Sequence, residues 1–202
     1  MKKKTEIIII PMISLNKKGM GIGQVFMFII VILTFGVIMI FGYKAISDFL
    51  ESGEQVSFVQ FKNSLEGDIK RIYTEFNSVR EVKYKLPGKY TQICFVDMDF
   101  ADAVGKMDEL CQLDVVACSV WEDALQARQS NPSRLNPGYL SVDSNVFLQP
   151  DALKIKVHTI KAADAQGNEQ GFYCAPITRG SITLRLEGKG SYTLISPAPE
   201  QG

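Results

Sequence analysis

The sequence predicts an α+β protein with an N-terminal transmembrane helix that continues into an amphipathic helix, followed by a small antiparallel β-rich head with one further helix. Three observations support this fold class. A charge-free apolar run comes first, apolar residues at spacings of three and four follow it, and the last third of the chain alternates apolar and polar residues. The first two patterns are typical of helices and the third is typical of strands.

The first element is the run between Lys18 and Lys44, which contains no charged residue. As an α-helix, residues 19–43 rise roughly 37 Å at about 1.5 Å per residue, more than a hydrocarbon core of about 30 Å. A cleaved secretory signal is the competing interpretation, but its apolar core spans about 7 to 15 residues and ends in small residues. This run is longer and ends in Phe41-Gly42-Tyr43. The sequence therefore predicts a transmembrane helix, with the lipid bilayer as a partner.

Charge is distributed unevenly about this segment. The net charge is zero, yet beyond Lys44 the chain holds 21 of its 22 acidic residues and only 16 of its 22 basic residues. Basic residues on the N-terminal side place that end in the cytoplasm, so we expect a single-pass protein of the cell membrane with an extracytoplasmic head. A mildly acidic head without a clustered basic face also argues against nucleic acid as a partner.

An amphipathic helix is expected next, over residues 44–80. Its apolar stripe consists of Phe58, Phe61, Leu65, Ile69, Ile72, Phe76 and Val79. These residues recur at spacings of three and four and therefore lie on one helix face. Gly53 interrupts the pattern, and Pro87-Gly88 ends the helical region.

The head begins with a period of two from Val82 onward. After Pro87-Gly88, residues 93–96 are typical of a buried strand, and the two segments could form a hairpin. Helical spacing between Val104 and Leu125 predicts the one further helix, although Val115-Val116 weakens it because β-branched residues lose rotamer freedom in helices. Residues 130–144 are expected to form a loop. Further strands are expected at 153–157, 172–177, 182–186 and 192–195.

The domain limits follow from these patterns. They are 1–18 for a basic cytoplasmic leader, 19–43 for the transmembrane helix, 44–80 for the amphipathic helix, 81–196 for the extracytoplasmic head and 197–202 for a tail without a pattern.

All four cysteines, Cys94, Cys111, Cys118 and Cys174, follow the apolar run, where an oxidising compartment makes disulfides the default. On one straight helix, Cys111 and Cys118 are about 10.5 Å apart, too far for a bridge that needs Cα atoms within about 7 Å. Each would then pair with Cys94 or Cys174. If the helix is irregular at Val115-Val116, the bridges are Cys111–Cys118 and Cys94–Cys174, which is the pattern we favour. Scattered thiols are the remaining alternative, and a zinc site lacks a Cys-x-x-Cys pair.

The segment Asp97-Met98-Asp99 after the strand 93–96 is similar to the Asp-x-Asp start of haloacid-dehalogenase-like phosphatases, where one carboxylate attacks phosphate. The pattern departs from that family at Ala101. Asp97, Asp99 and Asp102 could instead hold Ca²⁺, but carboxylates more often cap and start a helix, which we favour. His158 is expected to face solvent. The sequence thus predicts no enzymatic activity, no cofactor, no bound metal and no small-molecule substrate.

The junction between leader and apolar run carries a short motif. Lys18-Gly19 ends the leader, and Gln24 is a lone amide at the start of the apolar run. Together with the two-part helix and a disulfide-closed β head, this arrangement resembles type IV pilins and pseudopilins, the archaeal members most closely. The resemblance implies that a membrane peptidase cuts between Gly19 and Met20, so that Gln24 stands fifth in the mature chain, where the family usually has Glu. Gly21 would occupy the second mature position, where archaeal pilins usually carry a larger or hydroxyl-bearing residue.

The resemblance, which covers Lys17 to about Val79, implies a structural subunit of a surface filament or membrane-associated assembly. Its partners would be copies of itself or related pilin-like subunits. The alternative is an uncleaved single-pass membrane anchor that presents an extracytoplasmic binding or sensing module. A continuous helix from about Gly23 to Val79 favours the first, and a flexible break at Gly53 favours the second.

Overall fold

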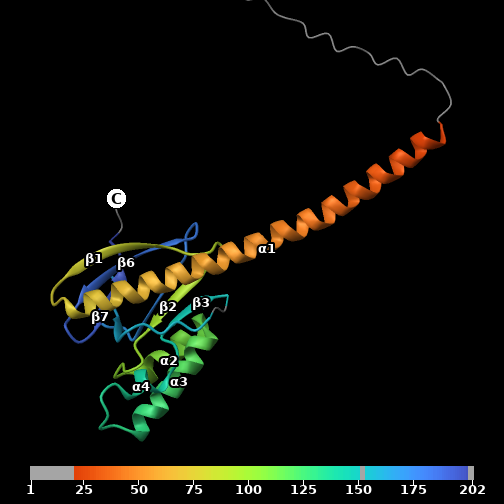
Figure 1. The fold of residues 1–202 in the computed structure, drawn as a ribbon. Coiled ribbons are helices and arrows are strands. Elements are labelled where there is room, and N and C mark those ends of the chain that lie inside the picture. Colours follow the sequence, from red (N-terminus) through yellow and green to blue (C-terminus); the bar gives the residue numbers. More distant parts are fainter. Residues whose placement is uncertain (1–20, 151–152, 200–202) are drawn as a thin grey trace, which may run out of the picture. The chain divides into compact units, whose positions relative to one another are not determined.

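The computed structural model describes residues 21–150 and 153–199 (Figure 1). The chain divides into two compact units, Met1–Leu50 and Glu51–Gly202. The helices are α1 (Ile22–Thr74), α2 (Ala103–Leu113), α3 (Val115–Ser130) and α4 (Pro137–Ser141). The strands are β1 (Val79–Lys85), β2 (Gln92–Val96), β3 (Val146–Gln149), β4 (Ile160–Ala162), β5 (Phe172–Pro176), β6 (Ser181–Gly188) and β7 (Thr193–Pro197).

The C-terminal part of α1 confirms the amphipathic helix. Its stripe Phe58, Phe61, Leu65, Ile69 and Ile72 is buried in the core of the second unit. The expected end at residue 80 is wrong, because α1 stops at Thr74 and Phe76 is 70% exposed. The chain reverses at Asn77, whose φ is 60°, and the Asn77 amide donates to the carbonyl of Gly188. This turn leads into β1, which lies back along the helix (Figure 1).

A four-stranded sheet in the order β1-β6-β7-β4 packs against α1. β1 is antiparallel to β6, β6 is antiparallel to β7, and β4 is parallel to β7. Tyr84, Leu184 and Ile195 alternate inward and join the helical stripe in one hydrophobic cluster. The alternate residues of β1 and β6 face the other way, so this sheet has one apolar face and one polar face.

The hairpin that residues 82–86 and 93–96 could have formed is not what the structure shows, since β1 pairs with β6. β2 is instead the centre of a second, three-stranded sheet in the order β3-β2-β5. The physical reason is that β2 is buried on both faces, whereas β1 is buried only toward α1. Ile93 and Phe95 join the cluster under α1, and Cys94 and Val96 join a second cluster with Trp121. β2 therefore separates two hydrophobic cores.

The single helix expected between Val104 and Leu125 is wrong, since the structure has α2 and α3 with a break at Asp114. Asp114 is extended (φ −151°, ψ 106°), and its carboxylate accepts a 2.9 Å hydrogen bond from the amide of Ala117. A buried N-cap of this kind stabilises the start of a new helix. These helices and α4 lie on the side of β2 away from α1 (Figure 1).

The segments flanking residue 150 also differ from expectation. The expected loop 130–144 contains the short helix α4, and the next segment forms β3. Around the expected strand 153–157, the described residues form only an isolated bridge between Val146 and Ile155. The strands expected at 172–177, 182–186 and 192–195 are confirmed as β5, β6 and β7.

Candidate functional site

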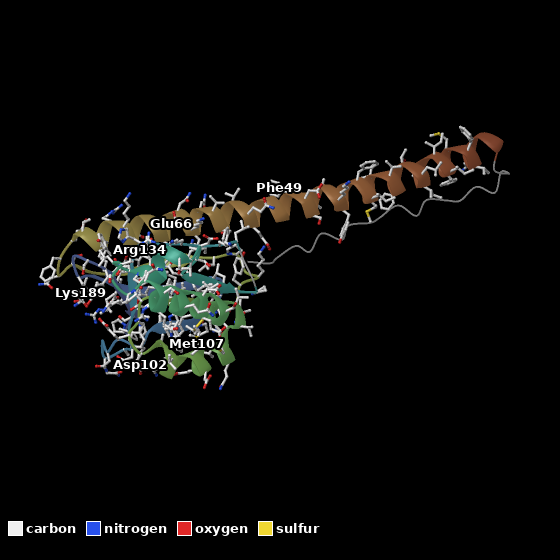
Figure 2. All side chains as sticks on the ribbon, turned by 90° about the horizontal axis from the view of Figure 1, so that it is seen from below. Phe49, Glu66, Asp102, Met107, Arg134 and Lys189 are labelled. Carbon is white, nitrogen blue, oxygen red and sulfur yellow. A yellow bond between two sulfur atoms is a disulfide. The ribbon has the colours of Figure 1, made fainter. Side chains whose placement is uncertain are left out.

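The first unit carries an exposed apolar surface on α1. Within the described chain, α1 is the one helix long and apolar enough to cross a membrane. Phe26, Ile32 and Ile40 are 64%, 69% and 71% exposed, and the side chains of this part of α1 project away from the ribbon (Figure 2). Contiguous apolar surface of this extent marks a site of membrane or protein interaction.

Two polar side chains on this surface differ in how they are satisfied. The hydroxyl of Thr34 donates within its own helix to the carbonyls of Ile30 and Val31, each at 3.0 Å. Gln24 is exposed, and its side-chain amide forms no hydrogen bond to another described residue. An unpartnered amide in hydrocarbon costs roughly 2 to 7 kcal/mol, so in a bilayer the Gln24 side chain would be favoured only near the headgroups or beside a hydrogen-bonding partner. Lys18, Gly19 and Met20 lie outside the described residues, as does the leader.

Both disulfides of the favoured pattern are present. Cys94 and Cys174 are directly opposite one another in the β2–β5 register, with Cα atoms 4.0 Å apart. Cys111 and Cys118 join α2 to α3 across the break at Asp114, which brings their Cα atoms to 4.9 Å. The pattern based on one straight helix is therefore wrong. Among the described residues there is no free cysteine.

The sulfur atoms of Cys111 and Cys118 also lie within 4.8 Å of a carboxylate oxygen of Glu122. A metal prefers thiolates as sulfur ligands, and both sulfur atoms are bonded to each other here. This group therefore has a structural rather than a metal-binding arrangement.

The Asp97-Met98-Asp99 segment holds main-chain groups in place. The Asp99 carboxylate accepts hydrogen bonds from the amides of Gly138 (2.8 Å) and Tyr139 (3.1 Å), so it caps α4. Asp97 Oδ1 accepts from the amide of Asp99 at 3.0 Å. Asp102 occupies the N-cap position of α2 without a capping hydrogen bond. The favoured capping role thus falls to Asp99, and the helix it caps is α4 rather than the one that follows it in sequence.

Of the three aspartates Asp97, Asp99 and Asp102, only Asp97 is buried. It is 5% exposed, and burial raises its pKa to about 7 despite the opposing hydrogen bond from Asp99 and the nearby Lys161. A raised pKa at a buried carboxyl is a feature of many catalytic acids, but structural groups share it. The main-chain carbonyl of Asp97 accepts from Trp121 Nε1 at 3.0 Å, which places the residue inside the second core.

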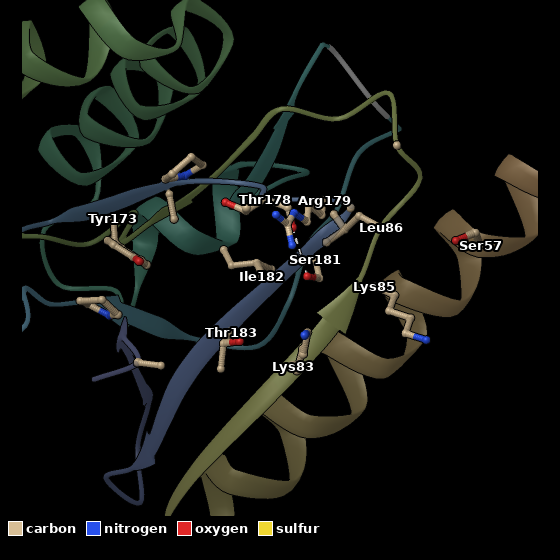
Figure 3. A pocket seen from close by; sticks show the side chains of 16 residues that line it. Ser57, Lys83, Lys85, Leu86, Tyr173, Thr178, Arg179, Ser181, Ile182 and Thr183 are labelled. Atoms are coloured by element: carbon tan, nitrogen blue, oxygen red, sulfur yellow. Dashed lines mark hydrogen bonds between the residues drawn. The ribbon is translucent and has the colours of Figure 1, made fainter. Parts of the chain in front are cut away.

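A basic hollow opens on the head, with an approximate volume of 1010 Å³ (Figure 3). β1, β5, β6 and the turn between β5 and β6 border it, together with Ser57 of α1. Lys83, Lys85 and Arg179 line it, and no aspartate or glutamate does. We call this feature the basic hollow. It differs from the expectation that the head has no clustered basic side chains.

Comparison with known proteins gives a plain result. No family model, no curated protein and no solved structure matches this chain. A function must therefore be inferred from the residues of the chain itself.

Two local environments could not be read correctly from the sequence. The expectation that His158 faces solvent holds only in part, because the residue is half-buried and its ring packs on Tyr73 with centroids 3.9 Å apart. Burial, with a smaller effect of Lys70, lowers the pKa of His158. The basic hollow was missed, although the alternation Lys83-Tyr84-Lys85 indicated that the two lysines share one strand face. Arg179 gave no such indication.

Proposed function

We propose that this chain is a pilin-like structural subunit of a surface filament or membrane-associated assembly. The observation that carries the proposal is the composition of α1, which supplies both the exposed, charge-free segment 21–43 and the buried stripe at the centre of the head. A helix used in this way presents one surface for lipid or neighbouring helices and another for its own domain. The head then needs no membrane contact of its own.

The apolar segment would pack beside copies of itself or related subunits. Because lipid tails are as apolar as the helix, packing between helices in a bilayer depends on close van der Waals contact and on polar side chains. If the chain is cut after Gly19, the amine of Met20 becomes available as a hydrogen-bond donor. Gln24 of a neighbouring subunit could accept from it and thereby set the stagger between helices.

Two further features are consistent with a head outside the cytoplasm. Both disulfides lie in the head, and bridges of this kind persist mainly in oxidising compartments. The basic residues that precede the apolar segment favour a cytoplasmic N-terminus.

The second candidate is an uncleaved single-pass anchor that presents a binding module outside the membrane. The basic hollow favours this candidate, because three cations that line one cavity suit the binding of an anion better than a purely structural role. The two candidates differ in whether the N-terminal leader is removed and in whether copies of the chain assemble.

The intact mass of the protein from its native membrane separates them. A mass that corresponds to a chain starting at Met20, together with recovery of the protein in a sheared surface fraction, is the expected result. A full-length chain in cells with an active processing peptidase would contradict the processed pilin and favour the anchor.

A further inference from the structure

The basic hollow has an unbalanced charge. None of Lys83, Lys85 and Arg179 forms an ion pair with another described residue. The part of the chain beyond Lys44 is nevertheless acidic overall, so acidic residues are available for pairing elsewhere on its surface. A concave surface lined by one sign of charge concentrates the field and attracts ions of the opposite sign.

β1 and β6 place two cations and two hydroxyls on one sheet face. Lys83 and Lys85 are exposed, whereas Tyr84 between them is buried toward α1. Thr183 lies opposite Lys83 in the strand register, and Ser181 lies opposite Lys85. Figure 3 shows Lys83 and Thr183 on adjacent strands at the edge of the hollow. Their side chains therefore project from the same face.

Arg179 reaches the hollow from a turn in which its backbone is strained. Thr178 and Ser181 exchange two main-chain hydrogen bonds of 3.1 Å, so Arg179 and Gly180 are the two central residues of the turn. Their φ values of 52° and 66° correspond to a type I′ turn, for which Asn-Gly is a preferred pair. A long side chain at positive φ is uncommon, and such residues gather at functional sites.

Gly180 fixes the position of this turn against β1. Its carbonyl accepts a 2.8 Å hydrogen bond from the amide of Leu86, and a Cβ at Gly180 would lie 3.0 Å from the carbonyl oxygen of Leu86. The turn therefore lies close to the end of β1, beside Lys85. Lys83 and Lys85 thus line the same cavity as Arg179, which follows them almost 100 residues later in the chain.

We propose that the basic hollow binds the phosphate group of an anionic ligand. Arg179 offers a planar fork of donors that matches phosphate oxygens, and Lys83 and Lys85 supply compact positive charges. The hydroxyl of Thr183 is a further donor on the same rim. The phosphate belongs either to a free ligand or to a lipid headgroup, since both offer the same oxygens. The proposal holds whether or not the chain assembles into a filament.

The test uses the full chain in a neutral detergent and inorganic pyrophosphate as the probe, titrated calorimetrically at low ionic strength. We expect saturable binding that weakens about tenfold in Arg179→Asn, because one charged hydrogen-bonding group is lost. Asn-Gly suits the turn, so this variant should melt at or above the temperature of the wild type. A loss of binding can then be separated from unfolding. The double variant Lys83→Gln/Lys85→Gln should weaken binding by a similar factor.

Arg134→Asn is the matched control. Arg134, labelled in Figure 2, is exposed, forms no ion pair with another described residue, and does not line the hollow. This variant should bind pyrophosphate as the wild type does. Equal affinities in Arg179→Asn and Arg134→Asn would show that any binding follows net charge alone, and the proposed site would be rejected.

A second arm identifies the source of the phosphate. The full chain is placed in phosphatidylcholine nanodiscs with or without phosphatidylglycerol, and lysine acetylation rates are compared by mass spectrometry. Slower acetylation of Lys83 and Lys85, with Lys154 unchanged, indicates a lipid headgroup. Binding of pyrophosphate without this protection indicates a free ligand. If the chain shows no pyrophosphate binding and no protection of Lys83 and Lys85, the proposal is overturned.

Discussion

The side-chain hydroxyl of Thr193 donates a 3.1 Å hydrogen bond to the main-chain carbonyl of Ile69, 124 residues earlier in the chain. Thr193 is the first residue of β7 and has no exposed surface, and Ile69 lies in the buried stripe of α1. The contact joins the helix to the centre of the sheet by a specific polar interaction in an otherwise apolar layer.

We expect Thr193→Val to lower the free energy of unfolding by about 1 kcal/mol, the typical net value of one hydrogen bond. Valine keeps the shape of threonine and has a methyl group in place of the hydroxyl. Thr183→Val, on the exposed face of β6, is the matched control and should change stability little. Chemical denaturation of the full chain in neutral detergent, followed by the emission of the single tryptophan Trp121, measures both. Equal changes in the two variants would contradict the role given to Thr193.

Gly188 is a position where α1 and β6 touch through their backbones. A Cβ there would lie 2.1 Å from the carbonyl oxygen of Glu75 and 2.3 Å from that of Ile72. Because neither backbone group can move without shifting the helix end, Gly188→Ala should cost about 3 kcal/mol of stability. Gly88→Ala, where no atom lies within 4 Å of the added Cβ, should be near neutral. Comparable melting temperatures for the two variants would show that the helix end is free to adjust.

Asp97 should make the stability of the head depend on pH. Burial raises its pKa from 3.8 to about 7, so between these values the folded state binds more protons than the unfolded state. Stability therefore falls as pH rises through this window. Asp97→Asn keeps an oxygen that can accept from the Asp99 amide and removes the titration. We expect this variant to be the more stable at pH 8, by up to about 4 kcal/mol, and to differ little below pH 4.

Unfolding midpoints measured across this pH range check the prediction. Asp102→Asn is the control for net charge, because Asp102 is exposed and makes no capping hydrogen bond. A wild-type profile that is flat between pH 4 and pH 7, or a gain in stability shared by both variants, would rule out Asp97 as the titrating group.

Gln24→Leu tests the polar contact that we propose between neighbouring subunits. The variant should insert into membranes as the wild type does, because the segment only becomes more apolar. Recovery of any sheared surface filament should fall, since the proposed partner of the Met20 amine is lost. Gly19→Val should keep the chain at its full precursor mass. Membrane fractionation, shearing and intact mass measure these outcomes, and unchanged filament recovery in Gln24→Leu would show that its amide has no role in the stagger.

Patterns within one element could be predicted from the sequence, and the points where elements end could not. The stripe from Phe58 to Ile72 follows from helical periodicity alone. Phe76 and Val79 keep the same phase, yet they lie beyond the helix because Asn77 turns the chain and bonds to Gly188. That contact involves a residue more than 100 positions away, so no local pattern contains it.

Strand pairing was the feature of the fold that was hardest to predict from the sequence. The apolar run 93–96 did predict a buried strand, but its neighbours are β3 and β5 rather than β1. Proximity in sequence favoured the hairpin, whereas burial on both faces required a central position. The disulfide pattern also depended on where a helix ends. The break at Asp114, which caps α3, allows Cys111 and Cys118 to pair. At the basic hollow, Lys83 and Lys85 alternate visibly, but Arg179 joins them only through the fold.

The Cys94–Cys174 bridge has a consequence for how the head responds to cleavage by proteases. Its two ends are 80 residues apart, and the segment between them includes α2, α3, α4, β3 and β4. The exposed stretch 131–135 lies inside that segment and contains Arg134, a cleavage point for trypsin-like enzymes. A cut there leaves two fragments held by a covalent cross-link between directly paired strands. The part of the head that follows the cut would therefore stay attached to the fragment that contains α1 until the Cys94–Cys174 bridge is reduced.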